Sequence, residues 1–125
     1  MHASLGLSRD EMPQVLTADV KDFIGWLKKK NISVERVVKN AKDLSPSQHQ
    51  LDADKVRNMV NKDDDGGPPI LTSSDDYVVD GHHRYMSRAL GDKTIECYRI
   101  NMPARELIKM MGEYPRVKYR PIHRE

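Results

Sequence analysis

The stretch YVVDGHHRYMSRALG, Tyr77 to Gly91, decides the fold because its pattern changes from strand to helix within two residues. Tyr77–Val79 is a run of aromatic and β-branched residues, which favour strands. From His82 onward the apolar residues recur at helical spacing, and Gly91 is a typical helix end. The stretch therefore predicts a strand that leads directly into a helix, with Asp80 and Gly81 at the junction.

The rest of the chain predicts alternating helices and strands around this unit. The predicted elements are a helix over Thr17–Lys30 capped by Thr17, a strand over Ile32–Asn40, a loop over Ala41–Gln50, a helix over Leu51–Lys62, a loop over Asp63–Pro69, strands Ile70–Thr72 and Tyr77–Val79 joined as a hairpin by SSDD, a strand over Thr94–Ile100, a helix from Pro103 to Gly112, and a basic, irregular end. This order predicts an α+β fold with a small mixed sheet flanked by helices.

Composition limits the chain to a single domain spanning residues 1–125, because 125 residues cannot enclose two independent cores. A formal net charge of +2 is too small to indicate a dedicated nucleic-acid binder. The single cysteine, Cys97, excludes an internal disulfide framework and predicts a reducing, cytoplasmic location. No apolar run approaches the length that spans a bilayer, so we expect no membrane partner.

The junction has the chemistry of an anion site, because a helix that begins after a strand presents unpaired N–H groups and a positive dipole end. Gly81 allows close approach to the backbone, and Arg84 can bind phosphate oxygens with two N–H groups. The alternative is purely structural: Asp80 caps the helix, Gly81 makes the turn, and His82 packs along one helical face. The sequence leaves both interpretations open.

A metal bound directly by the two histidines is disfavoured, because His82 and His83 are adjacent and point to different sides of a helix. Magnesium brought by a nucleotide and held by Asp80 together with phosphate oxygens is easier to accommodate.

The segments VVDGHHRYMSRAL, PPILTSSDDY and KDLSPSQHQLDADKV resemble the ParB/sulfiredoxin superfamily, and most closely its ParB-like branch often encoded by bacteriophages. The resemblance covers residues 32–100, with a helical extension at 1–31 and a helix and basic tail at 101–125. It implies that Gly81 and Arg84 bind the phosphates of a nucleotide such as ATP, ADP or CTP. It also implies a second nucleotide-contacting segment formed by Ser47, Gln48 and His49.

The branches of the superfamily resemble this sequence to different degrees. Sulfiredoxins carry a cysteine directly after the glycine, where this chain has His82. Partitioning ParB proteins add a helix-turn-helix module, for which this sequence ends too soon. Free-serine kinases resemble it most closely at Asp-Gly-His-His-Arg, which implies phosphoryl transfer to a small hydroxyl compound, with Glu35 as one candidate for the base.

The leading hypothesis is therefore a nucleotide-binding phosphotransferase or nucleotide hydrolase. Gly81 and Arg84 would hold phosphate, and Asp80 would orient a hydroxyl or Mg²⁺. His82 and His83 would supply hydrogen bonds or charge to the developing transition state. All four candidate catalytic side chains, Asp80, His82, His83 and Arg84, lie within five residues.

Two alternatives belong to other classes. One is a phage-type DNA-binding protein or nuclease, using basic residues interleaved with aromatic ones in the tail. Its candidate residues are Arg116, Lys118, Arg120, His123 and Arg124, with Tyr114 and Tyr119, and Asp63, Asp64 and Asp65 as the acidic cluster. The other is a non-catalytic adaptor that binds a host protein. Homodimerisation is open in every case.

Overall fold

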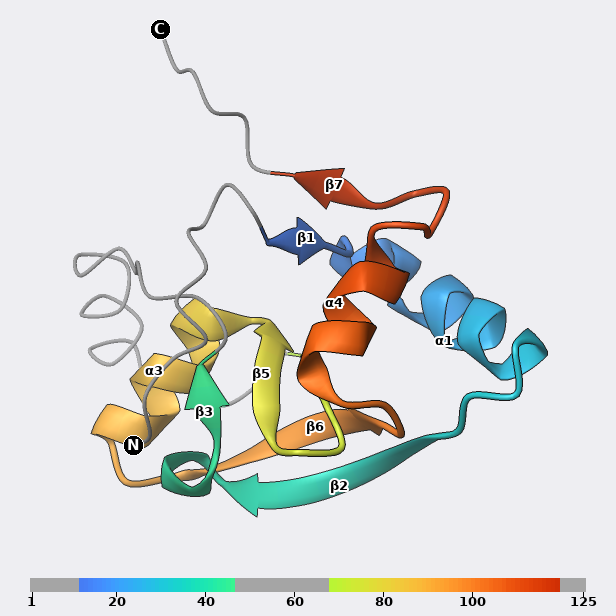
Figure 1. Cartoon of the computed structure of the whole chain (residues 1–125). Helices are drawn as coiled ribbons and strands as arrows, with labels where there is room; N and C mark the ends of the chain where they lie inside the picture. The colour runs from blue at the N-terminus through green and yellow to red at the C-terminus, as the bar shows by residue number, and fades with distance from the viewer. Residues whose placement is uncertain (1–11, 47–67, 120–125) are drawn as a thin grey trace, which may run out of the picture.

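In the computed structural model, residues 12–46 and 68–119 are described, and they form a mixed sheet with helices on both faces (Figure 1). The elements in chain order are β1 (Pro13–Gln14), a 3-10 turn η2 (Thr17–Asp19), α1 (Val20–Lys29), β2 (Val34–Asn40), a 3-10 turn η3 (Ala41–Asp43), β3 (Ser45–Pro46), β4 (Ile70–Thr72), β5 (Tyr77–Asp80), α3 (His82–Leu90), β6 (Thr94–Ile100), α4 (Ala104–Met111) and β7 (Lys118–Tyr119).

The main sheet has five strands in the order β2-β6-β4-β5-β3. β2 and β6 are antiparallel, β6 and β4 are parallel, β4 and β5 form the antiparallel hairpin, and β3 adds in parallel to β5. This arrangement confirms the predicted α+β class and the predicted hairpin. β5 lies inside the sheet: β3 pairs with its first two residues, and β4 pairs with it as far as Asp80, next to the junction with α3.

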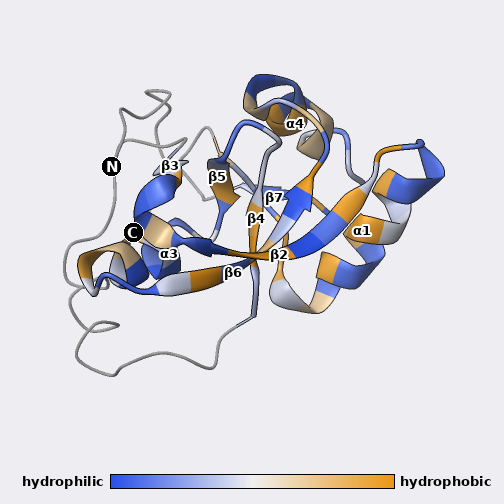
Figure 2. Ribbon diagram, turned by 90° about the horizontal axis from the view of Figure 1, so that it is seen from below, coloured by the Kyte–Doolittle hydropathy of each residue, from blue (hydrophilic) through white to orange (hydrophobic). Residues whose placement is uncertain are grey.

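Residues that alternate along the strands bury two separate clusters, one on each face of the sheet. On one face, Leu71 of β4 and Val79 of β5 pack with Phe23 and Leu27 of α1. The other members of this first cluster are Val15, Ile100, Leu107, Met111 and Tyr114. Residues 12–29 therefore share a core with the sheet and with α4. Figure 2 shows apolar residues on both α1 and α4.

The second cluster lies under α3. Ile70 and Val78, one residue before the members of the first cluster, face Tyr85 and Ala89 of α3. The Tyr85 hydroxyl is buried and donates a hydrogen bond of 3.0 Å to the carbonyl of Leu44. This contact fixes the start of α3 against the segment that precedes β3.

Three local predictions were wrong. Thr17 makes no side-chain cap, and the helix begins with the turn η2 before α1. Ser45–Pro46, predicted as loop, forms the short edge strand β3; at an edge a proline costs no hydrogen bond when its nitrogen faces outward. The end of the chain, predicted to be irregular, includes β7, which pairs antiparallel with β1. The helix predicted over Leu51–Lys62 lies outside the described residues.

Candidate functional site

The predicted junction is present: β5 ends at Asp80, Gly81 lies between, and α3 begins at His82. Gly81 has φ 92°, a left-handed conformation that residues with a Cβ rarely adopt. A Cβ at this position would lie 2.5 Å from Cγ2 of Ile70. The need for glycine is therefore explained by the turn and by packing against β4, whether or not a ligand approaches the backbone.

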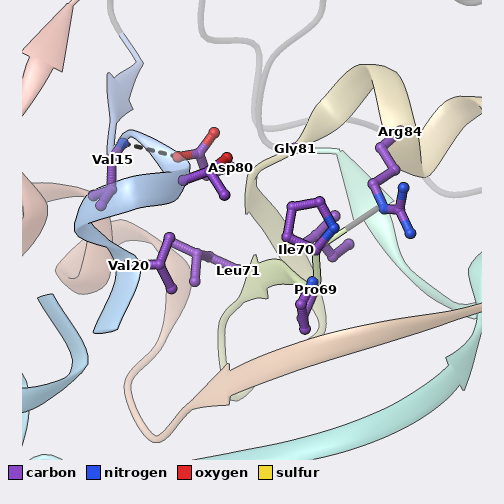
Figure 3. Close-up of a pocket in the computed structure, with 10 residues that line it drawn as sticks. Val15, Val20, Pro69, Ile70, Leu71, Asp80, Gly81 and Arg84 are labelled. Carbon is purple, nitrogen blue, oxygen red and sulfur yellow. Dashed lines mark hydrogen bonds between the residues drawn. The ribbon is translucent and has the colours of Figure 1, made fainter. Parts of the chain in front are cut away.

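Asp80 does not cap α3, contrary to the structural alternative considered from the sequence. No side chain caps this helix, and the Asp80 carboxylate instead accepts a hydrogen bond of 2.9 Å from the backbone N–H of Val15 (Figure 3). Burial raises the pKa of Asp80 from 3.8 to about 6, and hydrogen bonds from the backbone of Val15 and Gly81 oppose the rise. Asp80 is thus half-buried beside aliphatic neighbours with a pKa close to neutrality.

His82 lies in the interior, with only 5% of its surface exposed. Burial lowers its pKa to about 3, the neighbouring His83 lowers it further, and a hydrogen bond with the backbone of Val78 partly offsets both effects. His82 is therefore neutral at physiological pH. His83 is half-buried, on the next position of α3.

Arg84, in the first turn of α3, lines a pocket of about 90 Å³ together with Asp80 and Gly81. In Figure 3 its guanidinium lies on the far side of Ile70 from Asp80, so the cation and the carboxylate flank the pocket from different sides. The remaining lining is mainly apolar and comes from distant segments: Val15, Thr17, Val20, Pro68, Pro69, Ile70 and Leu71.

The part of the site that sequence reasoning missed is the segment from Val15 to Val20. It lines the pocket and supplies the N–H group bound by Asp80, although 65 residues separate Val15 from Asp80. Every residue except proline has a backbone N–H, so no sequence motif could have predicted this contact.

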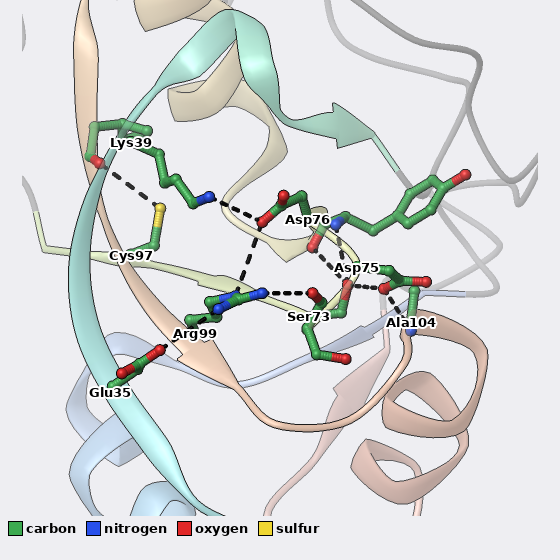
Figure 4. A network of polar contacts seen from close by, with 11 residues as sticks. Glu35, Lys39, Ser73, Asp75, Asp76, Cys97, Arg99 and Ala104 are labelled. Carbon is green, nitrogen blue, oxygen red and sulfur yellow. Dashed lines mark hydrogen bonds and ion pairs between the residues drawn. The ribbon is translucent and has the colours of Figure 1, made fainter.

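Glu35, the candidate base, lies in a different place. It is on β2, with its carboxylate 3.5 Å from the guanidinium of Arg99 (Figure 4), and it lines a second pocket that contains neither Asp80 nor Arg84. A role for Glu35 at the junction therefore has no support from its position.

The remaining predicted site residues are only partly described. Ser47, Gln48, His49 and the Asp63–Asp65 cluster lie outside the described residues, as do Arg120, His123 and Arg124. Within the described tail, Tyr114 is buried and donates a hydrogen bond to Asp22, so its ring is not available to stack on a base. Arg116 is 3.4 Å from Asp19, whereas Lys118 and Tyr119 of β7 are exposed.

Two features are absent from residues 12–46 and 68–119. No three acidic, histidine or cysteine side chains there gather closely enough to hold a metal ion. None of the helices there is both long enough and apolar enough to cross a bilayer.

Comparison with known proteins gives a likeness in structure only. No family model and no curated protein matches the sequence. Among solved structures, the chain is similar to a Pnob8-like ParB-N domain, with a TM-score of 0.49 and 11% sequence identity. The match covers 66% of this chain and 36% of that one, so the chain spans about a third of the structure that it matches.

Proposed function

We propose that this protein binds a nucleotide, with a phosphate group at the first turn of α3, and that it transfers or hydrolyses that phosphate. The observation that carries the proposal is the pocket at the N-terminus of α3, which Gly81 lines together with Arg84 on one side and Asp80 on another. Three features support it: a cation that can form two hydrogen bonds to phosphate, helix N–H groups with no side-chain cap, and a carboxylate with a raised pKa.

Arg84 is the residue expected to contribute most to binding. Its guanidinium is planar and always charged, so it can bind two oxygens of one phosphate group at once. The α3 N-terminus has no side-chain cap, which favours an anion there. Hydrogen bonds that involve a charged group contribute about 1.5–3 kcal/mol each, enough for roughly a tenfold or greater change in affinity.

Asp80 is the residue that we assign to proton transfer. A general base works best when its pKa lies near the working pH, and burial brings the Asp80 pKa to about 6. Its carboxylate also suits a Mg²⁺ ion that is held mainly by phosphate oxygens, since such an ion needs only one or two protein carboxylates. The small hydroxyl compound that would accept the phosphate would have to reach this carboxylate.

A pocket of about 90 Å³ admits a phosphate group but not a whole nucleotide. The base and ribose would therefore extend beyond the lining residues named above. Ser47, Gln48 and His49 are our candidates for contacting them, on the basis of the family resemblance alone. Because His82 is buried, we assign it to orienting the turn, and we assign contact with the ligand to His83.

Binding is tested by isothermal titration with ATP, ADP, CTP and inorganic triphosphate, each with and without Mg²⁺. We expect the wild type to bind at least one of them, and Arg84→Ala to bind at least about tenfold more weakly. Arg88→Ala is the matched control, because Arg88 lies one turn further along α3 and does not line the pocket. If the wild type binds none of the four, the proposal is wrong.

Turnover is tested separately by release of phosphate, or its transfer to a small alcohol, with Asp80→Asn. We expect this variant to bind nucleotide but to lose most of its turnover, because an amide cannot accept the proton. A variant that retains full turnover would remove Asp80 from the chemistry while leaving the binding proposal intact.

A further inference from the structure

β2 forms an exposed edge of the five-stranded sheet. It stands at the end of the strand order, and within the described residues it pairs along its whole length with β6 alone. It is seven residues long, and Val38, next to its central residue Val37, is 62% exposed. Edge strands of this length carry unpaired backbone groups that can pair with another strand.

The hydrogen bonds at the two ends of β2 show which of its residues bond to β6 and, by alternation, which direct their backbone N–H and C=O groups to the open edge. The N–H of Asn101 donates to the carbonyl of Ser33, and the N–H of Ala41 donates to the carbonyl of Lys93. Hydrogen-bonded pairs alternate in an antiparallel ladder, so the odd-numbered residues of β2 bond to β6. The N–H and C=O groups of Val34, Arg36, Val38 and Asn40 therefore point to the open edge.

The charges on β2 are arranged so that the strand complements a second copy of itself. In a two-fold antiparallel pair centred on Val37, Arg36 lies opposite Val38 and Val34 opposite Asn40, which are the residues with outward backbone groups. The same register places Glu35 directly opposite Lys39 of the other copy, twice. These would be non-hydrogen-bonded pairs, in which side chains lie closest.

Intrachain contacts extend this complementarity. Lys39 is 3.4 Å from Asp76, and Glu35 is 3.5 Å from Arg99. Across the two-fold axis the side chains would form a row of alternating sign: Asp76 and Lys39 from one copy, then Glu35 and Arg99 from the other. Moving the centre to Arg36 would place two arginines opposite each other, and moving it to Val38 would take Glu35 away from Lys39.

We propose that this protein forms a symmetric homodimer by antiparallel pairing of β2 with β2 of a second copy, centred on Val37. A pair of single strands buries less than the roughly 1,200 Å² typical of a stable interface, so the dimer is weak and concentration-dependent. The occupant of the edge is a second copy rather than an unrelated peptide, because the charge pattern complements itself.

The first test is sedimentation equilibrium of the wild type and of Val38→Pro, from about 10 µM to about 1 mM, a range that covers weak association. Proline removes an outward N–H without touching the ladder to β6, and it is tolerated at a sheet edge. We expect the wild type to dimerise and the variant to dissociate at least about tenfold more readily. Val38→Thr, which keeps the N–H and a β-branched side chain, should dimerise like the wild type.

The second test uses Glu35→Lys and Lys39→Glu, which do not depend on tolerance of a proline. Each variant alone places like charges opposite each other and should be monomeric. When the two variants are mixed, the two lysine side chains of the first would face the two glutamate side chains of the second, so the mixture should form heterodimers at low salt. A wild type that stays monomeric at about 1 mM, or a mixture that does not associate, would overturn the proposal.

Discussion

The two ends of β5 place an aspartate in different surroundings. At the hairpin end, Asp76 has a left-handed backbone with φ 64° and lies among cations, with Lys39 at 3.4 Å and Arg99 at 3.9 Å (Figure 4). At the helix end, Asp80 is the last residue of the same strand, lies in a mainly aliphatic pocket, and accepts hydrogen bonds from the backbone N–H groups of Val15 and Gly81.

This difference distinguishes charged residues that stabilise the fold from a carboxylate that could take part in a reaction. Charges at the hairpin end neutralise one another and tie β2, β6 and the turn together, as expected of a folding contact. Burial with little compensation, as at Asp80, raises a pKa and costs stability, which proteins usually tolerate at functional sites. The comparison favours the helix end as the working site, and it can be tested by changing residues at either end.

The largest effect is expected for Gly81→Ala at the helix end. The added methyl group would meet Ile70 at 2.5 Å, and alanine would have to adopt φ 92°. Overpacking and backbone strain together predict a loss of about 3–4 kcal/mol in the free energy of unfolding. Gly25→Ala in α1 is the matched control: nothing lies within 4 Å of its added Cβ, so it should stabilise by about 0.5–1 kcal/mol. Urea denaturation measures the change in the free energy of unfolding for both variants, and equal changes would contradict this prediction.

A smaller effect of opposite sign is expected for Asp80→Asn. The pKa of Asp80 is raised on folding from 3.8 to about 6, so the folded state holds this proton more tightly than the unfolded state. Its contribution to stability is therefore fully present below pH 3.8 and is lost as the pH rises through about 6. At pH 7.5 the variant should be more stable than the wild type by at most about 3 kcal/mol, because it avoids a buried charge.

Urea denaturation of Asp80→Asn and wild type between pH 4 and pH 7.5 checks this sign. Their difference should grow with pH, since every other titrating group is common to both proteins. A difference that stayed constant across this range would mean that Asp80 titrates normally.

The sequence predicted the strand-to-helix junction because its signals are local. β-branched residues before Asp80, a glycine at the turn and helical spacing after it are all readable within fifteen residues, as are the strand Thr94–Ile100 and the hairpin. The burial of His82 agrees with the structural alternative, in which it packs along one face of the helix, but the sequence could not decide for it because the position of His82 depends on how α3 packs on β5. The residue type of a histidine at a helix start does not determine whether its side chain faces solvent or the core.

Contacts between distant segments explain the other differences. Asp80 binds Val15, Glu35 pairs with Arg99, and β1 pairs with β7, each across more than 60 residues. The first contact uses a backbone N–H as its donor, and the third is made by backbone groups on both strands, so the residue types do not specify either pairing. Surface ion pairs such as the second are energetically weak and are not specified by spacing.

The smallest of these effects is expected at the hairpin end, for Asp75→Ala. The Asp75 carboxylate accepts hydrogen bonds from the hydroxyl of Ser73 and, at 3.0 Å, from the N–H of Ala104, the first residue of α4. From the β4-β5 turn it thus accepts the first N–H group of α4, as a capping side chain would, although the N-cap residue is Pro103. Its loss should cost about 1 kcal/mol of unfolding free energy. Asp75→Asn keeps an accepting oxygen and should recover most of that loss. Because this end of β5 has a structural role, neither variant should change nucleotide binding, and a change in binding of about tenfold would place chemistry at the hairpin after all.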